Sequence, residues 1–205
     1  MSVTPNIMSE ISPGKTVVNK SKASIYWGEG GKVIITRWSP KVVLPQLEEL
    51  NTALRSTSTV IAGGAVLAAL DAVEYTDIDV FPLTLLAVID AHDILVKLGY
   101  KKTQVTPFFW MYHKPDSCCR PVQLVLAHTD VDGDVQRLLC RFDLSVCQVA
   151  VYHSVLHSNT IALRDISHKV LRVIGTSNIS KLISRIEKYT KRGYSSQSDE
   201  TLNEI

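Results

Sequence analysis

The stretch Thr59-Val-Ile-Ala-Gly-Gly-Ala-Val-Leu-Ala-Ala-Leu70, followed after six further residues by Asp77-Ile-Asp-Val-Phe81, decides the fold. Its first four residues are apolar or β-branched and predict a short strand over 59–62. The glycine pair ends that strand, and the alanine-rich run predicts a buried helix over 65–70. The second segment alternates polar and apolar residues, which predicts another strand that ends at Pro82.

The glycine pair lies between the predicted strand and the predicted helix. Because Gly63 and Gly64 lack side chains, the backbone can turn sharply there and bring its N–H groups close to a phosphate. The positive end of the helix dipole points to the same place. A tight turn also needs glycine for steric reasons alone, so this interpretation stays open beside phosphate binding.

Asp77 and Asp79 lie two residues apart in the second predicted strand, so their side chains project from the same face. Two neighbouring carboxylates repel each other unless a cation or water lies between them. Mg²⁺ takes oxygen ligands of this kind. The pair therefore predicts a Mg²⁺ (or Mn²⁺) site, and a solvent-facing edge strand is the structural alternative.

A third acid, Asp143, lies within the apolar segment Arg141-Phe-Asp-Leu-Ser-Val-Cys147. An acid in such surroundings is expected at the edge of the core. It is either a functional carboxylate or a structural one that caps or pairs, and the residues alone favour neither.

Joined in order, these motifs resemble the nucleotidyltransferase superfamily of DNA polymerase beta, and within it the head domain of tRNA CCA-adding enzymes and bacterial poly(A) polymerases. In that family a Gly-Gly or Gly-Ser turn precedes a strand that bears an Asp-x-Asp pair. The segment from Arg141 to Ala150 is similar to the family's Arg-Arg-Asp-Phe-Thr-x-Asn-Ala segment, with Phe142 in place of the second arginine. The resemblance covers residues 59–152.

The resemblance implies a metal-dependent transfer of a nucleoside monophosphate from an NTP to a hydroxyl of RNA, protein or a small molecule. Asp77 and Asp79 would hold two metal ions, and Asp143 is the candidate third catalytic acid. Nucleotide-binding residues would be Gly63, Gly64 and Arg141.

Two departures from the family pattern leave an inactive binding or regulatory module open. The strand that carries the third acid in many family members has the neutral Gln123 here, and Phe142 has no charge.

Near the C-terminus, four basic residues recur on one face of a predicted helix over 179–191. Such a stripe can neutralise the phosphates of a nucleic-acid acceptor, and a solvated helix face is the alternative. These candidate nucleic-acid-binding residues are Lys181, Arg185, Lys188 and Arg192.

The remaining patterns predict an α+β fold, a mixed β-sheet with helices packed mainly on one face, plus a C-terminal helical segment. We expect a flexible segment over 1–22, the nucleotidyltransferase-like domain over 23–152, a helical extension over 153–193 and a polar flexible tail over 194–205. Further elements are expected as a hairpin within 24–38, helices over 44–54 and 83–98, strands over 101–105, 108–112 and 122–127, a helix from Asp132 or Asp134 to Cys140, and a strand or core helix within 142–152.

Composition indicates a globular protein, since 45% of the 205 residues are hydrophobic and 20% are charged. No apolar run is long enough for a membrane span, and the N-terminus lacks the pattern of a secretory signal. Together with cysteines that form no C-x-x-C pair, this predicts a reduced, intracellular setting.

Overall fold

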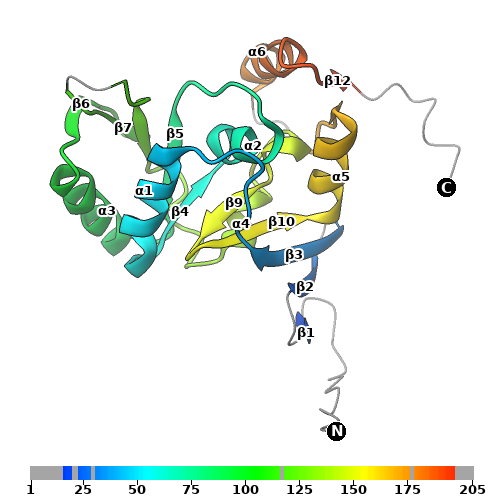
Figure 1. The fold of residues 1–205 in the computed structure, drawn as a ribbon, viewed down its shortest axis with the longest axis horizontal. Coiled ribbons are helices and arrows are strands. Elements are labelled where there is room, and N and C mark those ends of the chain that lie inside the picture. Colours follow the sequence, from blue (N-terminus) through cyan, green and yellow to red (C-terminus); the bar gives the residue numbers. More distant parts are fainter. Residues whose placement is uncertain (1–15, 20–22, 29–30, 116–117, 176–177, 197–205) are drawn as a thin grey trace, which may run out of the picture.

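A ten-stranded mixed sheet forms the centre of the protein, in the order β1-β2-β3-β10-β9-β4-β5-β8-β7-β6. The computed structural model describes residues 16–19, 23–28, 31–115, 118–175 and 178–196, with side chains from Lys32 onward (Figure 1). All pairings in this sheet are antiparallel except β5 with β8. The strands are β1 Thr16–Asn19, β2 Ala23–Gly28, β3 Gly31–Arg37, β4 Thr59–Ala62, β5 Ile78–Pro82, β6 Lys101–Val105, β7 Phe109–His113, β8 Val122–Val125, β9 Ala150–Tyr152 and β10 Val155–Asn159.

Most helices pack on one face of this sheet, as predicted. Their apolar residues form the larger core with inward-facing residues such as Ile61, Ile78, Val80 and Leu124. The short α4 covers part of the other face, where a smaller core includes Val60 and Leu138. The helices are α1 Pro45–Ala53, α2 Gly64–Asp71, α3 Leu85–Lys97, α4 Val135–Leu139, α5 Thr160–His168 and α6 Ile179–Thr190. The α+β architecture is thus confirmed.

The helix boundaries follow local signals in the sequence. Thr84 caps α3, because its hydroxyl accepts a hydrogen bond from Ala87 N, and Gly99 follows its end with a positive φ of 86°. Asp134, one of the two predicted caps, begins α4. Asn178 caps α6 in the same way.

The central sheet continues beyond the domain boundary predicted after residue 152. Strand β10 lies beyond it, yet it pairs with both β3 and β9 in the middle of the sheet. Helix α5 then packs against the same sheet. The region from 142 to 152 contains a short 3₁₀ helix, Ser145–Cys147, and the strand β9 rather than one continuous element.

The structure describes a small part of each terminal segment that was predicted to be flexible. Strand β1 lies within the segment 1–22, and Tyr194 at the start of the predicted tail is buried. Two short strands, β11 Val170–Leu171 and β12 Ser195–Ser196, pair in parallel near this end. The rest of both segments lies outside the described residues.

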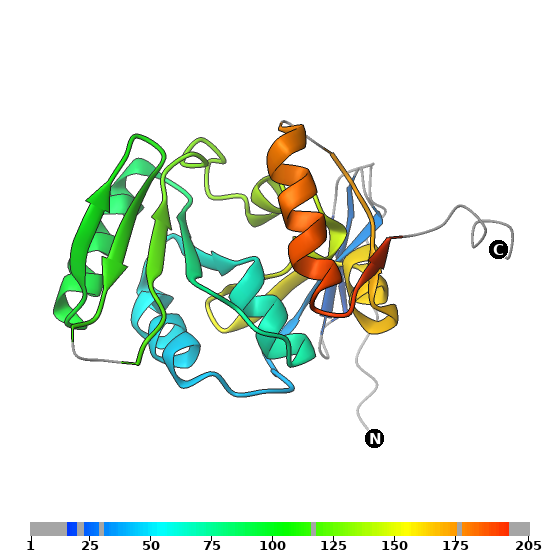
Figure 2. The ribbon, with the colours of Figure 1, turned by 90° about the horizontal axis from the view of Figure 1, so that it is seen from above.

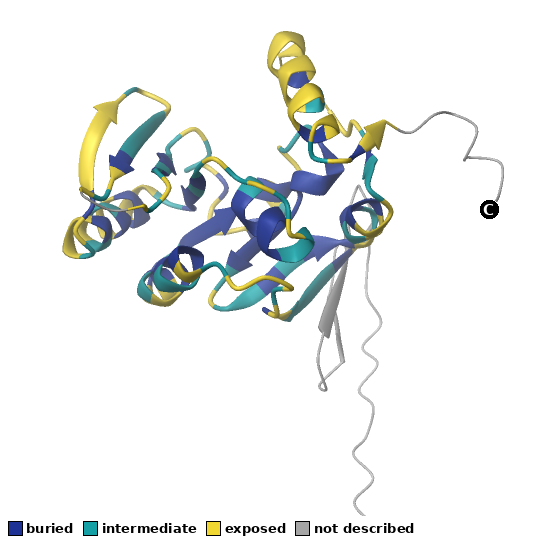
Figure 3. Cartoon of the chain, turned by 45° about the horizontal axis from the view of Figure 1, so that its top comes forward, coloured by how far each residue is buried: buried dark blue, intermediate teal, exposed yellow. Residues whose placement is uncertain are grey.

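Helix α6 (orange) lies near α5 (gold), on the side of the molecule away from β6 and β7 (Figure 2). Few of its residues are buried; Leu182 and Tyr189 are the two that anchor it. Figure 3 shows buried residues concentrated in the central strands, whereas α6 and β6 are mostly exposed. Across the described part of the chain, no helix is long and apolar enough to cross a membrane.

Candidate active site

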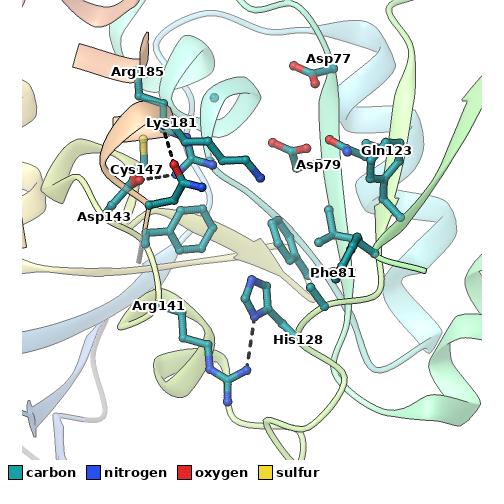
Figure 4. A pocket seen from close by; sticks show the side chains of 18 of the residues that line it. Asp77, Asp79, Phe81, Gln123, His128, Arg141, Asp143, Cys147, Lys181 and Arg185 are labelled. Atoms are coloured by element: carbon teal, nitrogen blue, oxygen red, sulfur yellow. Dashed lines mark hydrogen bonds and ion pairs between the residues drawn. The ribbon is translucent and has the colours of Figure 1, made fainter. Parts of the chain in front are cut away.

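A cleft of about 700 Å³ opens on the sheet face opposite most of the helices. Alternation along β5 turns Ile78 and Val80 into the core and Asp79 and Phe81 into the cleft, and Asp77, just before the strand, lines the cleft as well. The neighbouring β8 contributes Gln123 and Val125 to the same floor, and the walls come from β7, the segment around residues 127–143 and α6 (Figure 4).

The two predicted metal-binding carboxylates both face this cleft. Burial, and secondly the charge of Asp77, raise the pKa of Asp79 to about 7, while Lys188 and Arg185 act in the opposite direction. The hydroxyl of Thr76 donates a hydrogen bond of 2.6 Å to Asp77 Oδ1. Both carboxylates that the sequence placed on one strand face thus line the same cleft.

The glycine turn lies directly beside Asp79. Gly63 has a φ of +77°, and a Cβ at this position would lie 3.6 Å from Asp79 Oδ2, so both backbone strain and proximity favour glycine. The N–H of Gly63 donates to Val149 O at 3.1 Å. Of the glycine pair, it is therefore Gly64, the first residue of α2, whose N–H remains for a ligand.

Gln123 occupies the position beside Asp79 on the neighbouring strand. The register of the parallel pair β5 and β8 aligns these two residues directly. An amide oxygen is a neutral ligand, so the second strand adds no charge to the carboxylate pair.

Asp143 lies across the cleft from Asp79, on the opposite wall (Figure 4). Its carboxylate forms an ion pair with Arg185, and its side chain is 14% exposed. The backbone is held by a hydrogen bond from Ile174 N to Asp143 O. The geometry thus matches the structural alternative for Asp143, a carboxylate paired with a basic side chain. Among the described residues, no group of three His, Cys, Asp or Glu side chains is arranged to hold one metal ion.

Arg141 lines the other end of the cleft rather than the region of the carboxylates. Its guanidinium donates to both carboxylate oxygens of Asp130, at 2.6 and 3.0 Å, and approaches His128 Nδ1 at 3.3 Å. The predicted nucleotide-binding arginine is therefore already held by an acid.

Three of the four predicted basic residues of α6 face the cleft: Lys181, Arg185 and Lys188. Lys188 Nζ donates to Thr76 Oγ1 at 3.3 Å, which brings α6 next to Asp77. Arg192 does not line the cleft; its guanidinium lies 5.1 Å from the ring centre of Tyr189.

Several cleft residues were not identified from the sequence. The aromatic residues of the cleft belong to no sequence motif. Phe81, however, lies two residues after Asp79, and this spacing predicts that both side chains share one face of the strand. The buried Cys147 donates to the hydroxyl of Tyr189 at 3.2 Å. These additional lining residues include Phe81, Phe108, Phe109, His128, Phe142, Cys147, Asn178 and Tyr189.

Comparison with solved structures identifies similar folds, whereas no family model and no curated protein sequence matches the chain. A CCA-adding enzyme in its apo form I is 18% identical with a TM-score of 0.60, and the match covers 78% of this chain and 41% of that enzyme. The Thermotoga maritima CCA-adding enzyme complexed with tRNA is 17% identical with a TM-score of 0.58, and the match covers 78% of this chain and 42% of that enzyme. A tRNA nucleotidyltransferase complexed with a primer tRNA and an incoming ATP analog is 17% identical with a TM-score of 0.54, over 72% and 46%.

The chain spans less than half the length of these proteins. The glycines Gly63 and Gly64 and the acids Asp77 and Asp79 line one cleft of this chain. By its architecture, the chain has the nucleotidyltransferase-like fold found in CCA-adding enzymes.

Proposed function

We propose that this chain is a metal-dependent nucleotidyltransferase, which moves a nucleoside monophosphate from an NTP to a hydroxyl acceptor. The observation that carries the proposal is the position of Asp77 and Asp79 in one cleft, beside the Gly63-Gly64 turn and facing the basic side of α6. Negative ligands for a cation and positive groups for phosphates thus meet in one cavity.

The residues present fit Mg²⁺ or Mn²⁺. Mg²⁺ is commonly held by one or two protein carboxylates together with substrate phosphates and water, so Asp77 and Asp79 are sufficient protein ligands. The raised pKa of Asp79 points the same way, because a cation between the carboxylates would relieve the burial and repulsion that cause it. When bound, such an ion supplies positive charge to the phosphoryl oxygens and lowers the pKa of the acceptor hydroxyl.

The triphosphate would lie between the glycine turn and α6. The free N–H groups in the first turn of α2 can donate to phosphate oxygens. Lys181 and Lys188 face the same space from the opposite wall and would offset the phosphate charge. The basic residues of α6 would therefore contact phosphates inside the cleft, and their binding to the backbone of an RNA acceptor remains part of the proposal.

In the proposed reaction, the acceptor oxygen attacks the α-phosphorus and the bond from that phosphorus to the bridging oxygen breaks. Pyrophosphate leaves, and the hydroxyl proton passes to solvent. The chain's own residues mainly position the two reactants, which is the principal contribution of the protein in phosphoryl transfer.

An RNA 3′ end is the first acceptor to test, because two of the structural neighbours were solved with tRNA. A protein or small-molecule hydroxyl is the alternative acceptor, since the match spans 42% and 46% of those two proteins. A reduced, intracellular setting belongs to the same proposal.

Replacing Asp77 with alanine tests the catalytic proposal. Purified protein is incubated with each labelled NTP, Mg²⁺ or Mn²⁺ and total RNA, and pyrophosphate release is measured. Losing a metal ligand removes several kcal/mol of charge stabilisation, so we expect Asp77→Ala to lower turnover by at least about a hundredfold.

The matched control is Asp90→Asn, which removes an exposed carboxylate on α3 outside the cleft. It should leave turnover unchanged. Full activity in a folded Asp77→Ala protein would show that the carboxylate pair has been assigned the wrong role.

A binding module without catalysis is the second candidate function, and the neutral Gln123 beside Asp79 favours it. Calorimetry of NTP binding with and without Mg²⁺ separates the two. Metal-dependent binding without pyrophosphate release from any acceptor would favour the module.

A further inference from the structure

The cleft continues past the carboxylates into a region lined by rings. Phe81 follows Asp79 on the same face of β5, about 7 Å further along the strand at the usual rise per residue. The ring of Phe142 packs edge-on against that of Phe81, with centroids 5.6 Å apart, and His128 stacks on Phe81 at 6.0 Å. Together with Phe108, these residues form what we call the aromatic end of the cleft.

Phe108 stands at the rim of this region and is 67% exposed. Its backbone is fixed on both sides, because Phe108 N donates to Thr106 Oγ1 at 3.2 Å and Phe108 O accepts from Leu126 N at 2.7 Å. A large ring is thus held at the entrance of the cleft on a well-bonded turn, with most of its surface available to a ligand.

The aromatic end of the cleft lies directly beside the carboxylate of Asp79. A Cβ on Gly63 would lie 3.5 Å from Phe142 Cε1 and 3.6 Å from Asp79 Oδ2, so the ring and the carboxylate border the same small space. Val125 continues the apolar floor on β8. A ligand whose charged part reaches Asp79 would meet ring surfaces with its next group.

One polar side chain, His128, could form a hydrogen bond with the edge of such a ligand. Arg141 donates toward His128 Nδ1, so that nitrogen is the acceptor and the proton lies on Nε2. Burial, and secondly Arg141, lower the pKa of His128, which keeps its ring neutral near pH 7. Arg141 is itself held by Asp130, so the Arg141–Asp130 pair fixes the tautomer of His128.

We propose that the aromatic end of the cleft binds a nucleobase by stacking. Flat ring surfaces of proteins hold bases in this way, with little dependence on sequence. The proposal rests on the proposed function, because the carboxylates beside the aromatic end would hold the phosphate part of the same reaction. The base belongs either to the NTP donor or to the terminal nucleotide of the acceptor.

Binding measurements on Phe108→Ala test this site without relying on turnover. Titration calorimetry in Mg²⁺ uses three probes: ATP, inorganic tripolyphosphate and a trinucleotide without a triphosphate. Because stacking contributes about 1–3 kcal/mol per base, we expect Phe108→Ala to weaken one base-containing probe about tenfold and tripolyphosphate less than about twofold.

Two further variants make the result specific. Val105→Ala removes an apolar side chain of similar exposure on β6, outside the cleft, and should change none of the three affinities. Phe108→Trp keeps an aromatic surface and should restore binding.

The outcomes separate the sources of the base. Weakening of ATP identifies the donor base, and weakening of the trinucleotide alone identifies the acceptor base. Unchanged affinities in Phe108→Ala, or a wild-type protein that binds neither ATP nor the trinucleotide, would overturn the proposal. Binding of ATP that depends on Phe108 but leads to no pyrophosphate release would leave the base site standing and remove the proposed function instead.

Discussion

At the scale of single residues, Asp79 shows how burial changes the protonation of a carboxylate in the cleft. Its raised pKa of about 7 means that the folded protein holds a proton there between about pH 4 and pH 7, whereas an unfolded chain would have lost it. Without metal, the stabilising effect of that proton is lost as the pH rises through about 7. The proposed divalent cation would replace the proton and offset the repulsion between the two carboxylates.

Gln123 is the residue where this chain departs most clearly from a three-carboxylate arrangement. Because Gln123 aligns with Asp79 in the parallel register, Gln123→Asp would place a third carboxylate beside the pair. We predict about a tenfold or greater rise in Mn²⁺ affinity, since each added charge strengthens the attraction for the cation.

The effect is measured by Mn²⁺ titration with electron paramagnetic resonance. Gln104→Asp adds the same charge on the exposed strand β6 and serves as the control. Equal Mn²⁺ affinities for the two variants would mean that Gln123 does not border the metal site.

At the scale of elements, β10 carries a buried ring that opposes protonation. Burial, and secondly His153, lower the pKa of His157 to about 4 from the usual 6.5. The unfolded chain therefore binds a proton in this pH window that the folded chain does not, and the free energy of unfolding falls as the pH drops from about 6.5 to about 4.

We predict that His157→Gln removes part of this acid sensitivity, about 2 kcal/mol between pH 6.5 and pH 4. Urea denaturation at both pH values measures it. His168→Gln changes an exposed histidine on α5 and should keep the wild-type slope. A wild-type pH dependence in the His157→Gln protein would contradict the assignment.

The same strand explains why part of the fold was missed by sequence reasoning. Residues 59–82 show strong local signals: β-branched runs, a glycine pair and strict alternation, and each predicted element is present there. Strand β10 instead contains His157, Ser158 and Asn159, which are polar and yet wholly or partly buried. Ser158 and Asn159 form hydrogen bonds to Gln148 that exist only in the folded chain, so no local sequence pattern predicts the strand.

In the candidate site, too, local features could be predicted from the sequence and long-range contacts could not. The facing of Asp77 and Asp79 follows from the two-residue period of a strand and could be predicted. The pairing of Asp143 with Arg185 joins residues 42 positions apart, and the aromatic end depends on three separate segments. Such contacts arise from tertiary packing, which motif spacing does not encode.

At the scale of the whole molecule, a buried acid connects α6 to the body of the protein. Asp71, the last residue of α2, accepts hydrogen bonds from Tyr194 after α6 and from Lys169 after α5. Its side chain is only 8% exposed. Because α6 forms a wall of the cleft and buries few of its own residues, this cluster helps to hold the wall in place.

We predict that Asp71→Asn lowers the free energy of unfolding by about 1–3 kcal/mol, since a buried acceptor loses charge beside a lysine that is partly solvated. Hydrogen exchange should accelerate in α6 more than in the central strands. Asp93→Asn, an exposed site on α3, is the control. Unchanged exchange in α6 would show that the helix is held by its apolar contacts alone.

The central claim is that Asp77 and Asp79 share a divalent cation inside this cleft. Its most direct test is Mn²⁺ binding in the presence of an NTP, followed by electron paramagnetic resonance for the wild type, Asp79→Asn and Asp90→Asn. We predict tight binding by the wild type and Asp90→Asn, and a loss of at least about tenfold in Asp79→Asn, because one of the two protein ligands is gone. Equal Mn²⁺ affinity in all three proteins would contradict the account.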